Sequence, residues 1–107
     1  MELNIKNETS RLRAVVLGTA ESSGPVPRPE DCYDPKSLES VLTGTYPKES
    51  DMIMEMSAFE KVLKKHKVEV YRPHVLKDVN QIFARDIGFV IEDKFIRSNI
   101  LPNRIEE

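Results

Sequence analysis

Two opposite charges, Arg85 and Asp86, come directly before the apolar run Ile87–Ile91. Within that run only Gly88 lacks an apolar side chain, and glycine permits a bend or a close approach of the backbone. A carboxylate at the start of a buried strand is desolvated on one side and needs a cationic partner. Arg85 is a poor candidate, because neighbouring side chains of a strand point to opposite faces. The residues alone therefore leave two interpretations of Asp86: it binds a cationic ligand, or it has a structural role in a salt bridge or a loop hydrogen bond.

The segments on either side of Asp86 are predicted to be a loop and a hairpin. Residues 74–85 have the composition of a loop, with a short helix near Leu76. After the strand Ile87–Ile91, the segment Glu92–Phe95 predicts a tight turn, because Asp tolerates left-handed geometry. Phe95–Ile100 then returns as the hairpin partner.

The N-terminal part of the chain combines one strand with a long loop. Ala14–Leu17 is short, apolar and partly β-branched, which predicts a buried strand that ends at Gly18. The proline-rich segment 19–35 predicts a long surface loop, because proline fixes φ and removes a backbone donor. Lys36–Leu42 predicts one or two helical turns.

From Ser50 onward the hydrophobic period changes to that of a helix. Apolar side chains recur at spacings of four, three and four, which predicts an amphipathic helix of about four turns. They are Met52, Met56, Phe59 and Leu63. We expect Ser50 or Asp51 to cap this helix, and Glu60 with Lys64 to form an i,i+4 ion pair on it. Val68–Tyr71 then alternates as a strand. The order of elements predicts an α/β fold in which one helix covers one face of a sheet.

Size and charge restrict the classes of partner. The chain has 107 residues with a net charge of -2, which suits a single small domain over residues 1–107 with a modest core. The charge provides no field for nucleic acid or an acidic membrane. We therefore expect no nucleic acid and no membrane as a partner.

The single cysteine limits disulfide and metal chemistry, and the composition of the N-terminus bears on where the protein is located. Cys32 is the single cysteine, so an intrachain disulfide and a metal site built on several cysteines are excluded. We expect neither a metal nor a cofactor. The first residues lack the apolar core of a signal peptide, and no apolar run approaches the ~20 residues that span a bilayer. These features predict a cytoplasmic protein.

The pattern Asn-x-x-Phe-x-Arg-Asp at residues 80–86, followed by a strand and a tight hairpin, resembles the guanidino-group modifying enzymes. This superfamily includes amidinotransferases, arginine deiminases and dimethylarginine dimethylaminohydrolases. Arg11–Gly18, Ala58–Pro73 and Asn103–Glu106 resemble the family's opening strand, its first helix with the second strand, and the segment leading into its next helix. The resemblance implies a partial pentein, an α/β propeller, with about one ββαβ-type unit plus the start of the next. Among the branches, the amidinotransferases are most similar around residues 85–91.

The resemblance also implies roles for three residues. Asp86 is expected to grip the guanidino group of arginine or a related compound, since a carboxylate binds a guanidinium in bidentate geometry. Asn80 is expected to contact the amino-acid end of the substrate, with a turn or cap residue as the alternative. Arg104 is expected to hold a substrate carboxylate, with a solvated surface arginine as the alternative. The loop before Pro29 corresponds to a mobile lid in some relatives.

The family's mechanism needs a cysteine nucleophile, a histidine and an acidic residue that orients it. Cys32 lies in a proline-rich loop, and His66 and His74 have the contexts of surface residues. We therefore expect an N-terminal, substrate-side portion of an amidinotransferase-like enzyme that is inactive alone. A non-catalytic pentein-like binding or assembly module is the alternative. Open sheet edges and an uncovered apolar face predict self-association or binding of a complementing C-terminal chain.

Overall fold

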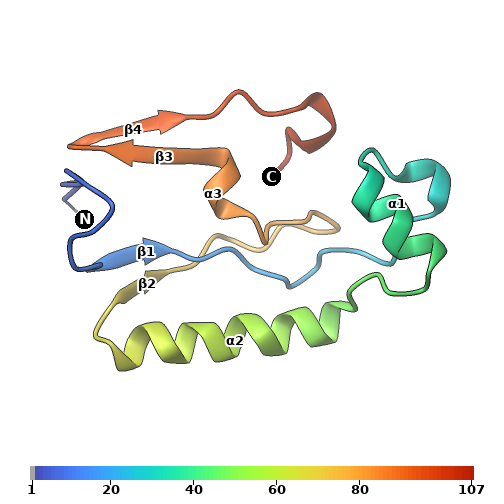
Figure 1. Cartoon of the computed structure of the whole chain (residues 1–107), viewed down its shortest axis with the longest axis horizontal. Coiled ribbons are helices and arrows are strands. Elements are labelled where there is room, and N and C mark those ends of the chain that lie inside the picture. The colour runs from blue at the N-terminus through green and yellow to red at the C-terminus, as the bar shows by residue number, and fades with distance from the viewer. Residues whose placement is uncertain (1) are drawn as a thin grey trace.

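The computed structural model describes residues 2–107 and confirms a mixed α/β fold. The elements are β1 (Ala14–Val16), η1 (Pro29–Asp31), α1 (Pro35–Leu42), α2 (Glu49–Lys65), β2 (Glu69–Tyr71), α3 (Ala84–Ile87), β3 (Gly88–Ile91), β4 (Lys94–Arg97) and η2 (Pro102–Arg104). Figure 1 shows a small parallel sheet between α2 on one side and the β3–β4 hairpin on the other, with α1 at one end of the molecule.

The parallel sheet consists of β1 and β2, with Val15 opposite Val70. Parallel neighbours need a crossover connection, and α2 supplies it. The helix begins after Lys48, which makes no side-chain cap. The predicted caps, Ser50 and Asp51, were wrong because both lie inside the first turn. Acidic residues in that turn and lysines in the last turn instead complement the helix dipole.

The antiparallel hairpin pairs β3 with β4, and Phe89 faces Ile96 across the two strands. Its turn uses the left-handed conformation at Glu92, where φ is 54°, rather than at the predicted aspartate. Ile5 pairs with Glu92, the residue after β3. The Ile5 N–H donates to the Glu92 carbonyl at 2.9 Å, and the Ile5 carbonyl accepts a hydrogen bond from the Glu92 N–H at 2.6 Å. The N-terminal segment is therefore tied to the hairpin turn.

The loop between β2 and α3 is held by a buried glutamine. No helix forms near Leu76 among the described residues, so that prediction was wrong. The Gln81 side chain instead accepts a hydrogen bond from the Leu76 N–H at 2.8 Å and donates one to the His74 carbonyl at 2.9 Å. Its backbone also bridges to Thr19 beyond the end of β1. Gln81 satisfies loop groups that a helix would otherwise have paired.

The buried core is small. Among residues 2–107, the buried apolar side chains are Leu17, Ala20 and Val68. The accessible surface is 8668 Å², whereas a compact monomer of this mass exposes about 6,100 Å². The radius of gyration is 15.6 Å, compared with about 13 Å for a compact domain of this length. Much apolar surface, including Phe89 and Ile91 of the hairpin, is therefore in contact with water.

No helix within residues 2–107 combines enough length with enough apolar character to cross a membrane.

Candidate functional site

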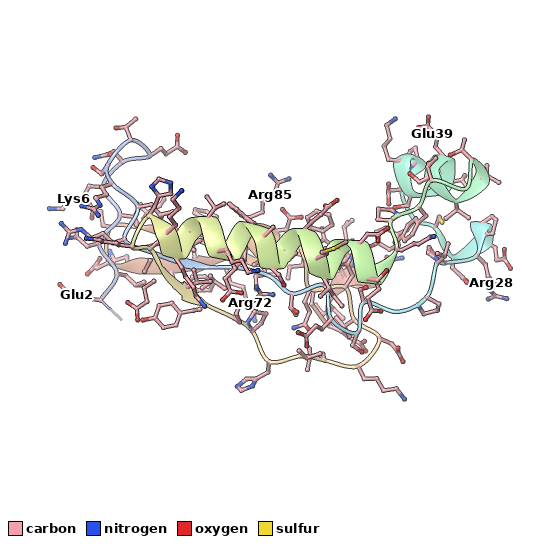
Figure 2. The ribbon with its side chains drawn as sticks, turned by 90° about the horizontal axis from the view of Figure 1, so that it is seen from below. Glu2, Lys6, Arg28, Glu39, Arg72 and Arg85 are labelled. Atoms are coloured by element: carbon pink, nitrogen blue, oxygen red, sulfur yellow. The ribbon has the colours of Figure 1, made fainter. Side chains whose placement is uncertain are left out.

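Asp86 lies in the helical turn α3, not at the start of a strand as predicted. Its N–H donates to the Phe83 carbonyl at 2.9 Å, and β3 begins two residues later, at Gly88. Because a helical turn lacks the alternation of a strand, Arg85 is not directed away from its neighbour. The Arg85 Nε lies 3.4 Å from the Asp86 Oδ1, although the Arg85 side chain is 85% exposed. Figure 2 shows the Arg85 side chain extending away from the ribbon.

Arg104 reaches the same carboxylate from the segment that follows the hairpin. Its Nη1 donates to the Asp86 Oδ2 at 3.2 Å, and its Nε donates to the Glu107 Oε1 at 2.7 Å. A further bond joins its Nη2 to the Glu107 Oε2. The guanidinium carbon lies 6.0 Å from the centroid of the Phe83 ring, within the range of a cation–π contact. The hydrogen bonds that Arg104 donates to Glu107 are the main cause that raises the pKa of Arg104, so its charge is permanent.

The third predicted site residue, Asn80, lies on the wall of the same cavity. Its Oδ1 accepts a hydrogen bond from the Ile82 N–H at 3.2 Å, which closes a local turn. The structure thus brings Asn80, Asp86 and Arg104 to one cavity. Their roles toward a substrate stay predictions.

This cavity has a volume of about 690 Å³, which is within the usual range for small-molecule sites. The proline-rich loop, α1, the loop before α3 and the segment around η2 all contribute to its wall. Among the lining side chains are Asp31, Asp34, Asp78, Asp86, Glu106 and Glu107 against Lys36, Arg85 and Arg104. The excess of carboxylates favours a ligand that carries positive charge.

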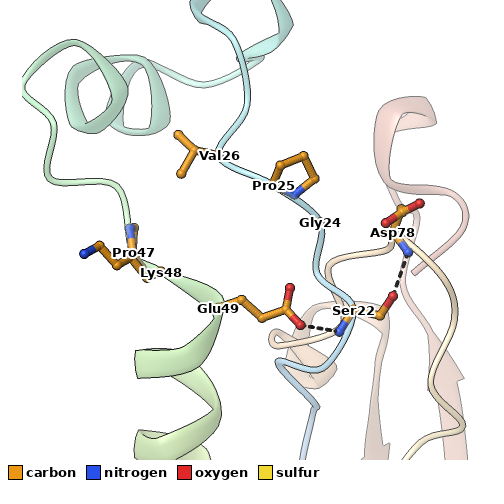
Figure 3. Close-up of a pocket in the computed structure, with 8 residues that line it drawn as sticks. All are labelled: Ser22, Gly24, Pro25, Val26, Pro47, Lys48, Glu49 and Asp78. Carbon is orange, nitrogen blue, oxygen red and sulfur yellow. Dashed lines mark hydrogen bonds between the residues drawn. The ribbon is translucent and has the colours of Figure 1, made fainter.

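A hydrogen-bonded junction anchors the proline-rich loop at a second, smaller pocket, which is shown in Figure 3 and shares Pro25 and Asp78 with the cavity. The Ser22 N–H donates to the Glu49 Oε1 at 2.9 Å, and the Asp78 N–H donates to the Ser22 Oγ at 3.0 Å. Both Ser22 and Asp78 have φ of 56°, a conformation that non-glycine residues adopt at a cost. The junction joins the start of α2 to the loop that leads into Asn80.

Two further residues of the cavity wall bear on chemistry. Ser23 was missed by the sequence reasoning; its Oγ is buried and has no hydrogen-bond partner among the described residues. The Cys32 thiol lies on the wall and donates to the Arg28 carbonyl at 3.5 Å. Neither His66 nor His74 contributes to this wall, so the cavity contains no thiol–imidazole pair.

Tyr33 contributes a phenol to the same wall. Partial burial, and then the negative charge of Glu107, raise its pKa above the ordinary value. At neutral pH the Tyr33 hydroxyl is therefore protonated and can donate a hydrogen bond.

Over residues 2–107, no group of three or more His, Cys, Asp or Glu side chains is placed to hold a metal ion. No family model matches the chain, and no curated protein or solved structure matches it either.

Proposed function

We propose that the chain is the N-terminal, substrate-side portion of an amidinotransferase-like enzyme of the pentein fold. Its substrate is arginine or a related guanidino compound, and its location is the cytoplasm. Asp86 binds the guanidino group, and Asn80 contacts the amino-acid end of the substrate. Arg104 is the candidate for the substrate carboxylate.

One observation carries this proposal: the carboxylate of Asp86 holds a guanidinium, that of Arg104, at the wall of a cavity large enough for an amino acid. The Asp86 side chain is 36% exposed, so a ligand can reach it. The Phe83 ring supplies an aromatic face for the same cation. These contacts support the proposal that Asp86 binds a guanidinium.

The proposed portion does not carry out the reaction alone. Cys32 has no histidine beside it on the cavity wall, and nucleophilic attack on a guanidinium carbon needs an activated thiolate and a proton donor. The large exposed surface supports a missing partner, since apolar side chains of the hairpin are left in water. A complementing C-terminal portion or a second copy would cover them.

Calorimetric titration with L-arginine tests the proposal. We expect saturable binding, and we expect Asp86→Asn to weaken it by more than ~1.5 kcal/mol, or more than tenfold, because a charge-assisted bond is lost. Glu60→Gln is the matched control: it also removes a carboxylate paired with two cations, but at a distance from the cavity. An unchanged affinity in Asp86→Asn would return Asp86 to a structural role. Turnover to urea, citrulline or a transferred amidine by this chain would overturn the claim that it is inactive alone.

A non-catalytic binding or assembly module is the second candidate. The exposure of Phe89, Ile91 and Phe95 on the hairpin favours it, because such surfaces commonly bind other proteins. This candidate predicts no arginine binding in the same titration together with stable association. Arginine binding that depends on Asp86 would exclude it.

A further inference from the structure

Arg104 is held unequally by its two carboxylate partners. Glu107 accepts from both Nε and Nη2 and is itself only 7% exposed. Asp86 accepts a single bond, at 3.2 Å. That distance is longer than the about 2.7–2.9 Å typical of charge-assisted bonds. Arg104 is thus anchored by Glu107 and only loosely engaged with Asp86.

We propose that Arg104 is an internal guanidinium that occupies the Asp86 site, and that a guanidino ligand has to displace it. This inference rests on the proposed function, since it concerns the regulation of the same site. The internal group and the ligand have the same planar fork of donors, so they compete for the same carboxylate oxygens.

The geometry makes this displacement inexpensive. When Arg104 leaves Asp86 it loses one long hydrogen bond and keeps both bonds to Glu107. Its charge therefore stays paired, which avoids the large cost of an unpaired, mostly buried cation. The Arg104 side chain is only 18% exposed, so Glu107 is the group that makes the exchange possible.

The exchange lowers the apparent affinity of the ligand, because only molecules with Arg104 off Asp86 can bind it. Removing the Arg104 guanidinium should therefore strengthen binding of a simple guanidinium. If Arg104 only held a substrate carboxylate and did not occupy the Asp86 site first, removing its guanidinium would bring no such gain.

Two probes separate these roles: methylguanidinium, which has no carboxylate, and L-arginine, which has one. We expect Arg104→Gln to bind methylguanidinium about fivefold more tightly than the unsubstituted chain. Arg72→Gln is the control, because it removes a guanidinium that is paired with Glu60 and does not line the cavity. We expect that control to change the affinity by less than about twofold, since the cavity wall keeps all its charged groups.

Equal or weaker methylguanidinium binding by Arg104→Gln would overturn the inference while leaving the proposed function intact. If the unsubstituted chain and Arg104→Gln both fail to bind either probe, the proposed function fails and the inference fails with it. Should Arg104→Gln not fold, the Nη1–H signal of Arg104 in the ¹⁵N spectrum of the unsubstituted chain gives the decision, because Nη1 is the atom that contacts Asp86. It should move in parallel with methylguanidinium saturation, and a signal that does not move would overturn the inference.

Discussion

Glu60 on α2 and Asp86 on α3 are both carboxylates with two cationic neighbours, yet their surroundings differ. The Glu60 oxygens lie 2.6 Å from the Lys64 Nζ and 2.8 Å from the Arg72 Nη1. The corresponding distances from Asp86 are 3.2 Å to Arg104 and 3.4 Å to Arg85. Glu60 is thus saturated by close partners, whereas Asp86 is held loosely.

This difference is the one that we expect between a structural ion pair, at Glu60, and the proposed ligand site, at Asp86. Glu60 joins α2 to the chain just after β2, because Arg72 follows that strand directly. The contacts of Asp86, in contrast, do not involve α2, β1 or β2, and its side chain lies on the wall of the large cavity. We therefore expect the Glu60 region to respond to mutation as part of the fold, and the Asp86 region to respond as a binding site.

The largest effect is expected at Gly18, where the chain after β1 lies against the loop that leads into α3. A Cβ at this position would collide with the backbone carbonyls of Gln81 and Ile82, with the Ile82 carbonyl carbon 2.7 Å away. We expect Gly18→Ala to lower the free energy of unfolding by about 3 kcal/mol, because backbone cannot give way as a side chain can. Urea denaturation measures the loss.

Gly24→Ala is the control for Gly18→Ala. Nothing lies within 4 Å of an added Cβ there, and its φ of 91° adds only backbone strain, so we expect a cost of about 1 kcal/mol. If Gly18→Ala costs no more than this control, the chain at Gly18 does not lie closely against the loop that leads into α3.

The next effect concerns the hairpin, which lies on the Asp86 side of the molecule. Phe89 is 50% exposed and faces Ile96 on the neighbouring strand, so a partner can bury both. We expect the chain to self-associate at micromolar concentration, as a symmetric dimer or with exchanged hairpins. Phe89→Lys should raise the dissociation constant at least about tenfold, because it places a charge in an apolar contact. Sedimentation equilibrium measures both quantities.

Leu42→Lys is the matched control for the hairpin, since Leu42 is also exposed but lies at the end of α1. It should leave the association unchanged. A well-folded, concentration-independent monomer of 12.3 kDa would show that these residues close their own core and would remove the support for a missing partner.

The smallest effect is expected at Glu60, and it depends on pH. The hydrogen bond from Lys64 is the main cause that lowers the pKa of Glu60 below its ordinary value of 4.5. Between the lowered pKa and 4.5 the unfolded chain binds more protons, so this stabilisation is present above 4.5 and is lost as pH falls through the folded value. In Glu60→Gln the free energy of unfolding should therefore depend less on pH in this range, as measured by urea denaturation at a series of pH values. An acid limb of unchanged slope would contradict this role.

The local parts of the fold were predictable from the sequence. The helix from residue 50 follows from its hydrophobic periodicity, and the structure confirms its start within one residue. The first strand of the hairpin is also confirmed within one residue, whereas the second strand ends at Arg97, three residues before the predicted Ile100. The Glu60–Lys64 pair was predicted for the same reason, because i,i+4 neighbours on a helix always face each other.

The long-range parts of the site were not predictable in the same way. The contact between Asp86 and Arg104 spans 18 residues of sequence and depends on the path of the hairpin between them. The helical turn at Asp86 was missed because the residues before Asp86 have the composition of a loop and Ile87 begins an apolar run, so no helical period is visible there. The two side-chain hydrogen bonds of Gln81 could not be predicted, because they depend on the path of the loop and a single glutamine in a loop carries no periodic signal.

The most direct test of the central claim is a titration of ¹⁵N-labelled chain with L-arginine, followed by amide chemical shifts. We expect saturable changes in amide chemical shift at Asn80, in α3 and around Arg104, and no change at the amides of Glu60 and Arg72. Shifts centred on Glu60 and Arg72, or no saturable shift at all, would contradict the assignment of Asp86 as the guanidinium site.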